Sequence, residues 1–208
     1  MTGVLICDDH RIVRQGIKQV LADAPEIRVV AEASDGQEAL TLVAAKRAEL
    51  HVVLLDIALP GLDGLEVLQQ IKQTEPGLPV LMLSTYPERQ YAVRCIKLGA
   101  AGYLNKSADP DDMLAAVRKV AAGGLYVTQS TAEALATALG TKTGTEALSH
   151  REHQVFRLLT LGRSVSEIGA QLKLAPNTVS TYRARILEKT GTKNDVELAL
   201  YARNQSTG

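Results

Sequence analysis

The sequence has no tryptophan, one phenylalanine (Phe156) and two cysteines. With so few aromatic side chains, any hydrophobic core must be built from aliphatic residues. Cys7 and Cys95 lie far apart in apolar stretches, which indicates buried thiols in a reducing compartment rather than a disulfide. No apolar run approaches the roughly 18 residues needed to cross a membrane. The N-terminus, MTGVLICDDH, has no basic flank and is not a signal peptide. We therefore expect a cytoplasmic protein.

The net charge of zero hides an asymmetry along the chain. Residues 1–121 contain 13 Lys and Arg against 16 Asp and Glu, whereas residues 148–208 contain 9 against 5. This asymmetry indicates that only the last part meets a polyanion. Residues 122–147 are rich in Gly, Ala, Ser and Thr and read as a linker with one short helix at 128–139 and a flexible stretch at 140–145. The boundaries predicted are a domain at 1–121, a linker at 122–147 and a second domain at 148–208.

Short apolar runs alternate with longer amphipathic patterns in the first domain. The runs that predict strands are 4–7, 28–33, 52–56, 80–84 and 102–104. The patterns that predict helices are 12–23, 36–46, 64–74, 88–98 and 110–121. This alternation predicts an α/β fold with a doubly wound parallel sheet. Such a sheet places its ligand site outside the carboxyl ends of the strands.

Polar side chains follow four of the predicted strands at that edge. Asp8 and Asp9 follow the first, Asp56 and Ser84 end the third and fourth, and Lys106 follows the fifth. Three carboxylates at one edge repel each other unless a cation lies between them, and an all-oxygen ligand set favours Mg²⁺ or Mn²⁺. Such an ion and the Lys106 ammonium would stabilise a phosphoryl group. Asp56 is then placed to attack phosphorus, with Ser84 offering its hydroxyl to a phosphoryl oxygen.

Each acid has a simpler interpretation when it is taken alone. Asp8 and Asp9 are placed to cap the helix that follows them. Asp63, in the segment PGLDG, is a turn residue rather than a ligand. His10 and His51 have no ligand-like partner in the sequence and are expected at the surface. The convergence of the set at one edge favours the functional interpretation.

Residues 148–208 carry only helical patterns. Helices are predicted at 152–160 and 165–172, followed by a turn, a third helix from Pro176 and a closing helix at 195–202. Two short helices joined by a tight turn make a helix-turn-helix. On the third helix, Val179, Tyr182 and Ile186 share one side. The opposite side, suited to a major groove, comprises Asn177, Ser180, Thr181, Ala184 and Arg185, and the candidate phosphate contacts are Lys173, Arg183, Lys189 and Lys193. The alternative is an ordinary polar surface.

Four motifs fall in order along the first domain: CDDH, LLDIALPGLDG, MLSTY and AAGYLNK. Over about residues 3–121 they resemble the receiver domain of bacterial two-component response regulators. The resemblance implies that Asp56 accepts a phosphoryl group from a histidine kinase. The implied switch residues are Ser84, Tyr103 and Lys106. The implied metal ligands are Asp8 (through water), Asp9, Asp56 and the backbone carbonyl of Ala58.

The last domain resembles the four-helix LuxR-type DNA-binding domain, through TVSTYRARILEKTG and NDVELALYA. The whole chain is similar to the NarL/FixJ family, with these segments nearest the GacA/UvrY branch. Two positions depart from the family pattern: Ser180 replaces a frequent Lys, and Ala175 replaces a frequent capping Ser. The closing helix resembles the family's dimer-forming helix, although a packing helix fits its apolar residues equally well.

The resemblance implies a flavodoxin-like receiver joined to a helix-turn-helix domain. Its implied function is a phosphorylation-controlled dimer that binds promoter DNA, with RNA polymerase as a further candidate partner and no membrane. One alternative is an atypical regulator whose receiver is a protein-interaction module and whose DNA binding ignores phosphorylation. A second is a phosphatase of the haloacid dehalogenase type. That class needs a second Asp two residues after Asp56, where this chain has Ala58, so we expect no enzyme.

Overall fold

The computed structural model describes residues 1–86, 88–138 and 148–205. The chain divides into two compact units, Met1–Gly140 and Thr141–Gly208. The predicted flexible stretch at 140–145 lies outside the described residues. No helix in the described ranges is long and apolar enough to cross a membrane.

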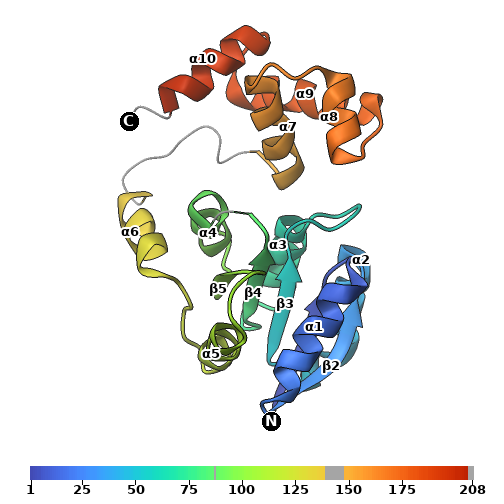
Figure 1. Ribbon diagram of the computed structural model, residues 1–208, viewed down its shortest axis with the longest axis vertical. Coiled ribbons are helices and arrows are strands. Elements are labelled where there is room, and N and C mark those ends of the chain that lie inside the picture. Colours follow the sequence, from blue (N-terminus) through green and yellow to red (C-terminus); the bar gives the residue numbers. More distant parts are fainter. Residues whose placement is uncertain (87, 139–147, 206–208) are drawn as a thin grey trace. The chain divides into compact units, whose positions relative to one another are not determined.

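The first unit is built around a five-stranded parallel sheet with helices on both faces (Figure 1). Its strand order is β2-β1-β3-β4-β5, which confirms the doubly wound α/β prediction. The strands are β1 (Thr2–Cys7), β2 (Ile27–Ala33), β3 (Val52–Asp56), β4 (Val80–Ser84) and β5 (Gly102–Asn105). The helices are α1 (Arg11–Ala22), α2 (Gly36–Lys46), the 3₁₀ turn η1 (Arg47–Glu49), α3 (Gly64–Thr74), α4 (Glu88–Lys97), α5 (Pro110–Ala121) and α6 (Gln129–Ala138).

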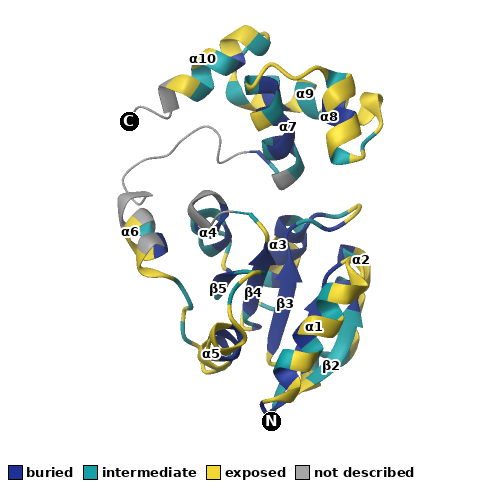
Figure 2. Ribbon diagram, viewed as in Figure 1, coloured by how far each residue is buried: buried dark blue, intermediate teal, exposed yellow. Residues whose placement is uncertain are grey.

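Alternate residues of β1, β3, β4 and β5 enter two separate cores. In β1, Leu5 and Cys7 belong to the core covered by α2, α3 and α4, whereas Val4 and Ile6 belong to the core covered by α1 and α5. Figure 2 shows the central strands buried and the outer faces of the helices exposed. A strand buried on both faces must be apolar throughout, so the runs in the sequence were sufficient to locate these strands.

Helix α6, predicted within the linker, belongs by its contacts to the first unit. It packs against α4, and Thr131 on α6 is buried. The segment before α6 also pairs with the sheet, because the Tyr126 amide donates to the Ala101 carbonyl at 2.8 Å. The packed unit therefore continues beyond the end of α5 and includes α6.

Gly16 occupies an exposed position inside α1. A methyl group added there would meet no atom within 4 Å. Because Gly has more freedom to lose on folding than Ala, we expect Gly16→Ala to raise the free energy of unfolding by about 0.5–1 kcal/mol. Hydrogen exchange of sheet amides, compared between variant and wild type, measures this change; faster exchange in the variant would contradict it.

Between residues 148 and 205, the second unit consists of four helices: α7 (His150–Thr160), α8 (Val165–Leu172), α9 (Pro176–Thr190) and α10 (Asp195–Gln205). Their shared core is aliphatic apart from Phe156. Capping boxes begin α7 and α8, where the side chains of Ser149 and Ser164 each accept a hydrogen bond from the backbone of a glutamate three residues on. These caps satisfy amides that a helix start leaves unpaired. The starts of α7 and α8 are thus fixed by side-chain caps.

Candidate functional site

The carboxyl edge of the sheet brings together two buried carboxylates and one ammonium. Lys106 Nζ lies 2.6 Å from Asp8 Oδ2 and 2.8 Å from Asp56 Oδ2. Asp8 is 0% and Asp56 2% exposed. Because Asp8 follows β1, Asp56 ends β3 and Lys106 follows β5, the parallel topology gathers residues that are up to 98 positions apart in the chain. Asp56 is therefore part of a charged cluster.

Burial dominates the electrostatics of Asp56. It raises the pKa of the Asp56 carboxyl above its ordinary value; Lys106 opposes the shift and the negative charge of Asp8 adds to it. Burial alone would lower the pKa of Lys106, but the Asp56 and Asp8 carboxylates outweigh it and raise that pKa. One ammonium thus serves two buried carboxylates, so the cluster favours a further positive charge.

Asp8 is held by three hydrogen bonds in addition to its pair with Lys106. Its side-chain Oδ1 accepts from the His10 amide at 2.8 Å, and its own amide donates to Ala33 at 3.1 Å. The Arg14 guanidinium donates to the Asp8 backbone carbonyl at 2.7 Å, and Arg14 in turn pairs with Glu32 on β2. The carboxylate is therefore fixed toward Lys106. The sequence reasoning missed Arg14, although its place one turn into the helix after Asp8 was a usable signal.

Asp9 and His10 lie at the outer side of this cluster. His10 is exposed, as expected, but its Nδ1 lies 2.6 Å from Asp9 Oδ1. Ligand atoms of Asp8, Asp9 and His10 lie within 4.8 Å of one another. His51 is also exposed, and its Nδ1 accepts from the Gly3 amide, away from the cluster. His10 follows Asp9 directly in the sequence, but the contact of its imidazole ring with the Asp9 carboxylate was not predicted.

The oxygen donors of this edge fit a hard divalent cation. Asp8 Oδ2 and Asp56 Oδ2 are buried oxygens, and the Lys106 ammonium is the one group that both of them contact within the described residues. Carboxylate oxygens of this kind are preferred ligands of Mg²⁺ and Mn²⁺. Ala58, implied as a carbonyl ligand, also directs its backbone amide to Asp56, a hydrogen bond that lowers the pKa of that carboxyl.

Ser84 and Tyr103 lie on the neighbouring strands β4 and β5, and both are buried. The Ser84 hydroxyl oxygen accepts from the Tyr86 amide at 3.0 Å. The Tyr103 hydroxyl donates to the Tyr86 carbonyl at 2.8 Å. Ser84 and Tyr103 therefore meet the same residue of the loop after β4, so a displacement of Ser84 is coupled to the environment of Tyr103.

Asp63 caps α3, as the turn interpretation anticipated. Its Oδ1 accepts from the amides of Leu65 and Glu66, and the Asp63 amide in turn donates to the Glu66 carboxylate. The following Gly64 packs against the end of β3, where an added Cβ would lie 2.0 Å from the Asp56 carbonyl oxygen. Only glycine allows this approach, and it fixes the backbone that carries Asp56. Neither aspartate after β1 caps α1, whose N-cap residue is His10.

The second unit presents the helix-turn-helix predicted from the sequence. α8 ends at Leu172, its C-cap residue Lys173 is in the left-handed conformation with φ of 54°, and α9 begins at Pro176. Val179 and Ile186 are buried, but Tyr182 is only partly buried. The side of α9 opposite the core is exposed and comprises Asn177, Thr178, Ser180, Thr181, Ala184 and Arg185. Thr178 was missed by the sequence reasoning, although it shares a helical ridge with Tyr182 and Arg185.

Two of the candidate phosphate contacts are engaged inside the second unit. Arg183 Nε donates to both carboxylate oxygens of Asp195, at 2.8 and 3.1 Å. Lys189 Nζ lies 2.6 Å from an oxygen of the buried Glu152. Burial opposes ionisation of Glu152, but the hydrogen bonds from Lys189 and from the Ser149 backbone lower its pKa overall. Lys173 and Lys193, by contrast, are exposed beside the helix.

The start of α9 lacks a side-chain cap, because Ala175 stands at the N-cap position. A serine there would accept a hydrogen bond from an amide of the first turn. We expect Ala175→Ser to stabilise α9 by about 1 kcal/mol. Slower hydrogen exchange of the α9 amides would show it. Ser164→Ala, which removes the cap of α8, is the matched control and should change exchange in α8 in the opposite direction; unchanged α9 exchange in Ala175→Ser would contradict the expectation.

Two family models match the chain. A response regulator receiver domain matches residues 4–118, and the luxR family of bacterial regulatory proteins matches residues 146–202. The response regulator UvrY of Escherichia coli strain K12 is 37% identical over 202 residues, covering 95% of this chain and 92% of UvrY. The transcriptional regulatory protein UhpA of the same strain is 40% identical over 199 residues, covering 96% of both chains.

A solved structure covers both units. RcsB from Salmonella enterica serovar Typhimurium, bound to promoter rprA in the presence of the phosphomimetic BeF3-, gives a TM-score of 0.61 at 27% identity and covers 96% of this chain and 97% of RcsB. The fold and the matched domains define a two-component response regulator with a receiver and a LuxR-type DNA-binding domain. The chain belongs to the NarL/FixJ family of these regulators, and its similarity to UvrY agrees with the motif resemblance.

Proposed function

We propose that the chain is switched by phosphorylation of Asp56 and binds promoter DNA as a phosphorylation-controlled homodimer. The observation that carries the proposal is the cluster at the sheet edge, where Lys106 lies within 2.8 Å of both Asp8 and Asp56. This arrangement places a nucleophilic carboxylate beside a fixed ammonium, which suits phosphoryl transfer by charge stabilisation.

In the proposed reaction, a carboxylate oxygen of Asp56 attacks the phosphorus of a phosphohistidine on a sensor kinase. The P–N bond to the imidazole breaks, and an acyl phosphate forms on Asp56. Mg²⁺ or Mn²⁺, held by Asp8, Asp9, Asp56 and the carbonyl of Ala58, would supply further neutralisation of the phosphoryl charge. Ala58, two residues after Asp56, has no side-chain group that could act as an acid or base for turnover. We therefore propose that the chain is a regulator and not an enzyme.

The acyl phosphate adds about −1.5 to −2 charge and several acceptor oxygens. Lys106 then turns from Asp8 to the phosphoryl group, and the Ser84 hydroxyl donates its proton to a phosphoryl oxygen. The Ser84 hydroxyl oxygen also accepts from the Tyr86 amide, and the Tyr86 carbonyl accepts from the Tyr103 hydroxyl. The loop after β4 therefore shifts when Ser84 moves. Helix α4 follows this loop and packs against α6. The shift thus reaches the element that leads out of the receiver.

The proposed DNA contact is made by the exposed side of α9, with Lys173 and Lys193 on phosphates. Helix α10 carries two exposed apolar residues one turn apart, Val196 and Leu200, which suit a dimer contact. The bound promoter in the RcsB structure supports double-stranded DNA as the partner. Contact with RNA polymerase and a place in the cytoplasm, where promoter DNA is found, belong to the same proposal.

Phosphoryl acceptance is tested directly with acetyl phosphate as a small donor. We expect intact-mass measurement to show one phosphoryl group per chain in the presence of Mg²⁺, and none after chelation with EDTA. Hydroxylamine, which cleaves acyl phosphates, should remove it. A chain that gains no phosphoryl group at saturating donor and Mg²⁺, from acetyl phosphate or from a phosphohistidine donor, would contradict the proposal.

A further inference from the structure

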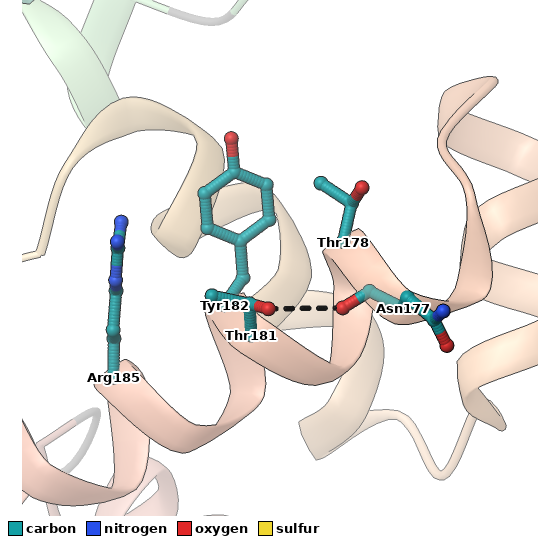
Figure 3. A pocket seen from close by; sticks show the side chains of 5 residues that line it. All are labelled: Asn177, Thr178, Thr181, Tyr182 and Arg185. Carbon is teal, nitrogen blue, oxygen red and sulfur yellow. Dashed lines mark hydrogen bonds between the residues drawn. The ribbon is translucent and has the colours of Figure 1, made fainter.

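A hollow of about 300 Å³ lies along the flank of α9, lined by Asn177, Thr178, Thr181, Tyr182 and Arg185. Arg185, Tyr182 and Thr178 extend from the helix in the same direction, with Tyr182 between the other two (Figure 3). They occur at helical spacings of three and four residues, so they form one ridge. The centre of the exposed side, around Thr181 and Ala184, lies beside this ridge.

The ridge presents hydrogen-bond donors. Arg185 carries a guanidinium with five donors, and Tyr182 and Thr178 carry hydroxyls. Thr181 differs from them, because its hydroxyl donates to the Asn177 carbonyl at 3.0 Å and its one proton is already used (Figure 3). A ligand that offers only acceptor oxygens, such as a phosphate, would therefore accept hydrogen bonds from Arg185, Tyr182 and Thr178 and not from Thr181.

Arg185 also differs from the other cations of α9. Arg183 is paired with Asp195 and Lys189 with Glu152. Arg185 is exposed and forms no ion pair within the described residues of the second unit. It is thus the cation of this helix whose charge is available to a ligand without the loss of an internal salt bridge.

We propose that this hollow seats a phosphate of the DNA backbone, bound by the Arg185 guanidinium and the Tyr182 hydroxyl, with Thr178 as an adjacent donor. The inference rests on the proposed DNA-binding function and names the contact that positions α9 in the groove. Because backbone contacts fix register without reading sequence, base discrimination falls to the central residues Asn177, Ser180, Thr181 and Ala184. This assigns to Tyr182, expected from the sequence to lie with the core, a direct role at the DNA surface.

The test uses the full chain and a fluorescent duplex selected by the wild-type protein from genomic fragments, with a scrambled duplex beside it. Binding is measured by anisotropy across a range of salt concentrations. A phosphate contact releases condensed counterions, so its loss lowers the slope of log K against log salt by about 0.9 for each half-site. We expect Arg185→Met to lower the slope by this amount and to weaken both duplexes roughly ten- to hundredfold. Arg163→Met removes an equal charge just before the N-cap residue of α8, and it should keep the wild-type slope.

Tyr182→Phe keeps the packed ring and removes only the hydroxyl. We expect it to weaken both duplexes equally, by roughly two- to tenfold. If Arg185→Met instead relaxes the preference at one base pair and keeps the slope, Arg185 reads a base and the phosphate proposal is overturned. Equal binding by Arg185→Met and wild type at every salt concentration also overturns it. If the wild-type chain binds no duplex at all, the proposed DNA-binding function fails and this inference fails with it.

Discussion

Asp56→Asn is expected to abolish phosphoryl acceptance. The amide cannot attack phosphorus as a carboxylate does. Asp8 is not expected to replace it, because Asp8 Oδ1 already accepts from the His10 amide and Asp8 Oδ2 lies 2.6 Å from Lys106 Nζ. Intact-mass measurement after incubation with acetyl phosphate and Mg²⁺ should show no phosphoryl group on the variant, against one on wild type.

The fold should survive this change. Burial disfavours the charged form of Asp56, and an asparagine of nearly equal size removes that cost while Lys106 keeps its pair with Asp8. Far-UV circular dichroism of the variant should match wild type. A suitable control is Asp63→Asn, which changes a capping aspartate outside the cluster and should leave phosphoryl acceptance in place. A fully phosphorylated Asp56→Asn protein would place the acceptor elsewhere.

Gly64→Ala is expected to destabilise the first unit by about 3 kcal/mol. The added Cβ would lie 2.0 Å from the Asp56 carbonyl oxygen and 2.8 Å from the Ile57 Cα. Both atoms belong to the backbone, so no side-chain rotation relieves the clash. The strand end that carries Asp56 must move, and phosphoryl acceptance should fall with stability. Denaturant unfolding and hydrogen exchange of β3 amides measure the effect.

Gly16→Ala is the matched control for this prediction, because it adds the same methyl group to the same unit in open space. The two variants should shift stability in opposite directions. If Gly64→Ala unfolds at the same denaturant concentration as wild type, the close approach of α3 to β3 is not a constraint on the fold.

The strands and the sheet edge could be predicted from sequence because each rests on local pattern plus one topological rule. The run Val52–Asp56 is apolar up to a terminal carboxylate, and the structure has the strand at the same residues. Parallel strands end at one edge, so the sequence alone predicts that Asp56 and Lys106 lie together. Helix α9 was equally accessible, since Pro176 marks its first turn.

Side-chain pairings could not be predicted in this way. The pairing of Lys189 with Glu152 joins residues on two helices, and nothing in the pattern of α9 distinguishes Lys189 from a free surface lysine. The same holds for Arg183 and Asp195. Periodicity also assigned Tyr182 to the core, because a helical wheel does not show that a long ring at the edge of the apolar side can reach solvent.

The most direct test of the account is DNA binding by wild type and Asp56→Asn, each with Mg²⁺ and with or without beryllium fluoride, an acyl-phosphate mimic. Anisotropy is measured on genomic fragments that the protein itself selects. The account predicts that beryllium fluoride tightens binding by wild type and leaves Asp56→Asn unchanged. Equal binding by both proteins in every condition would show that Asp56 is no switch, and a phosphorylation-independent regulator would replace this account.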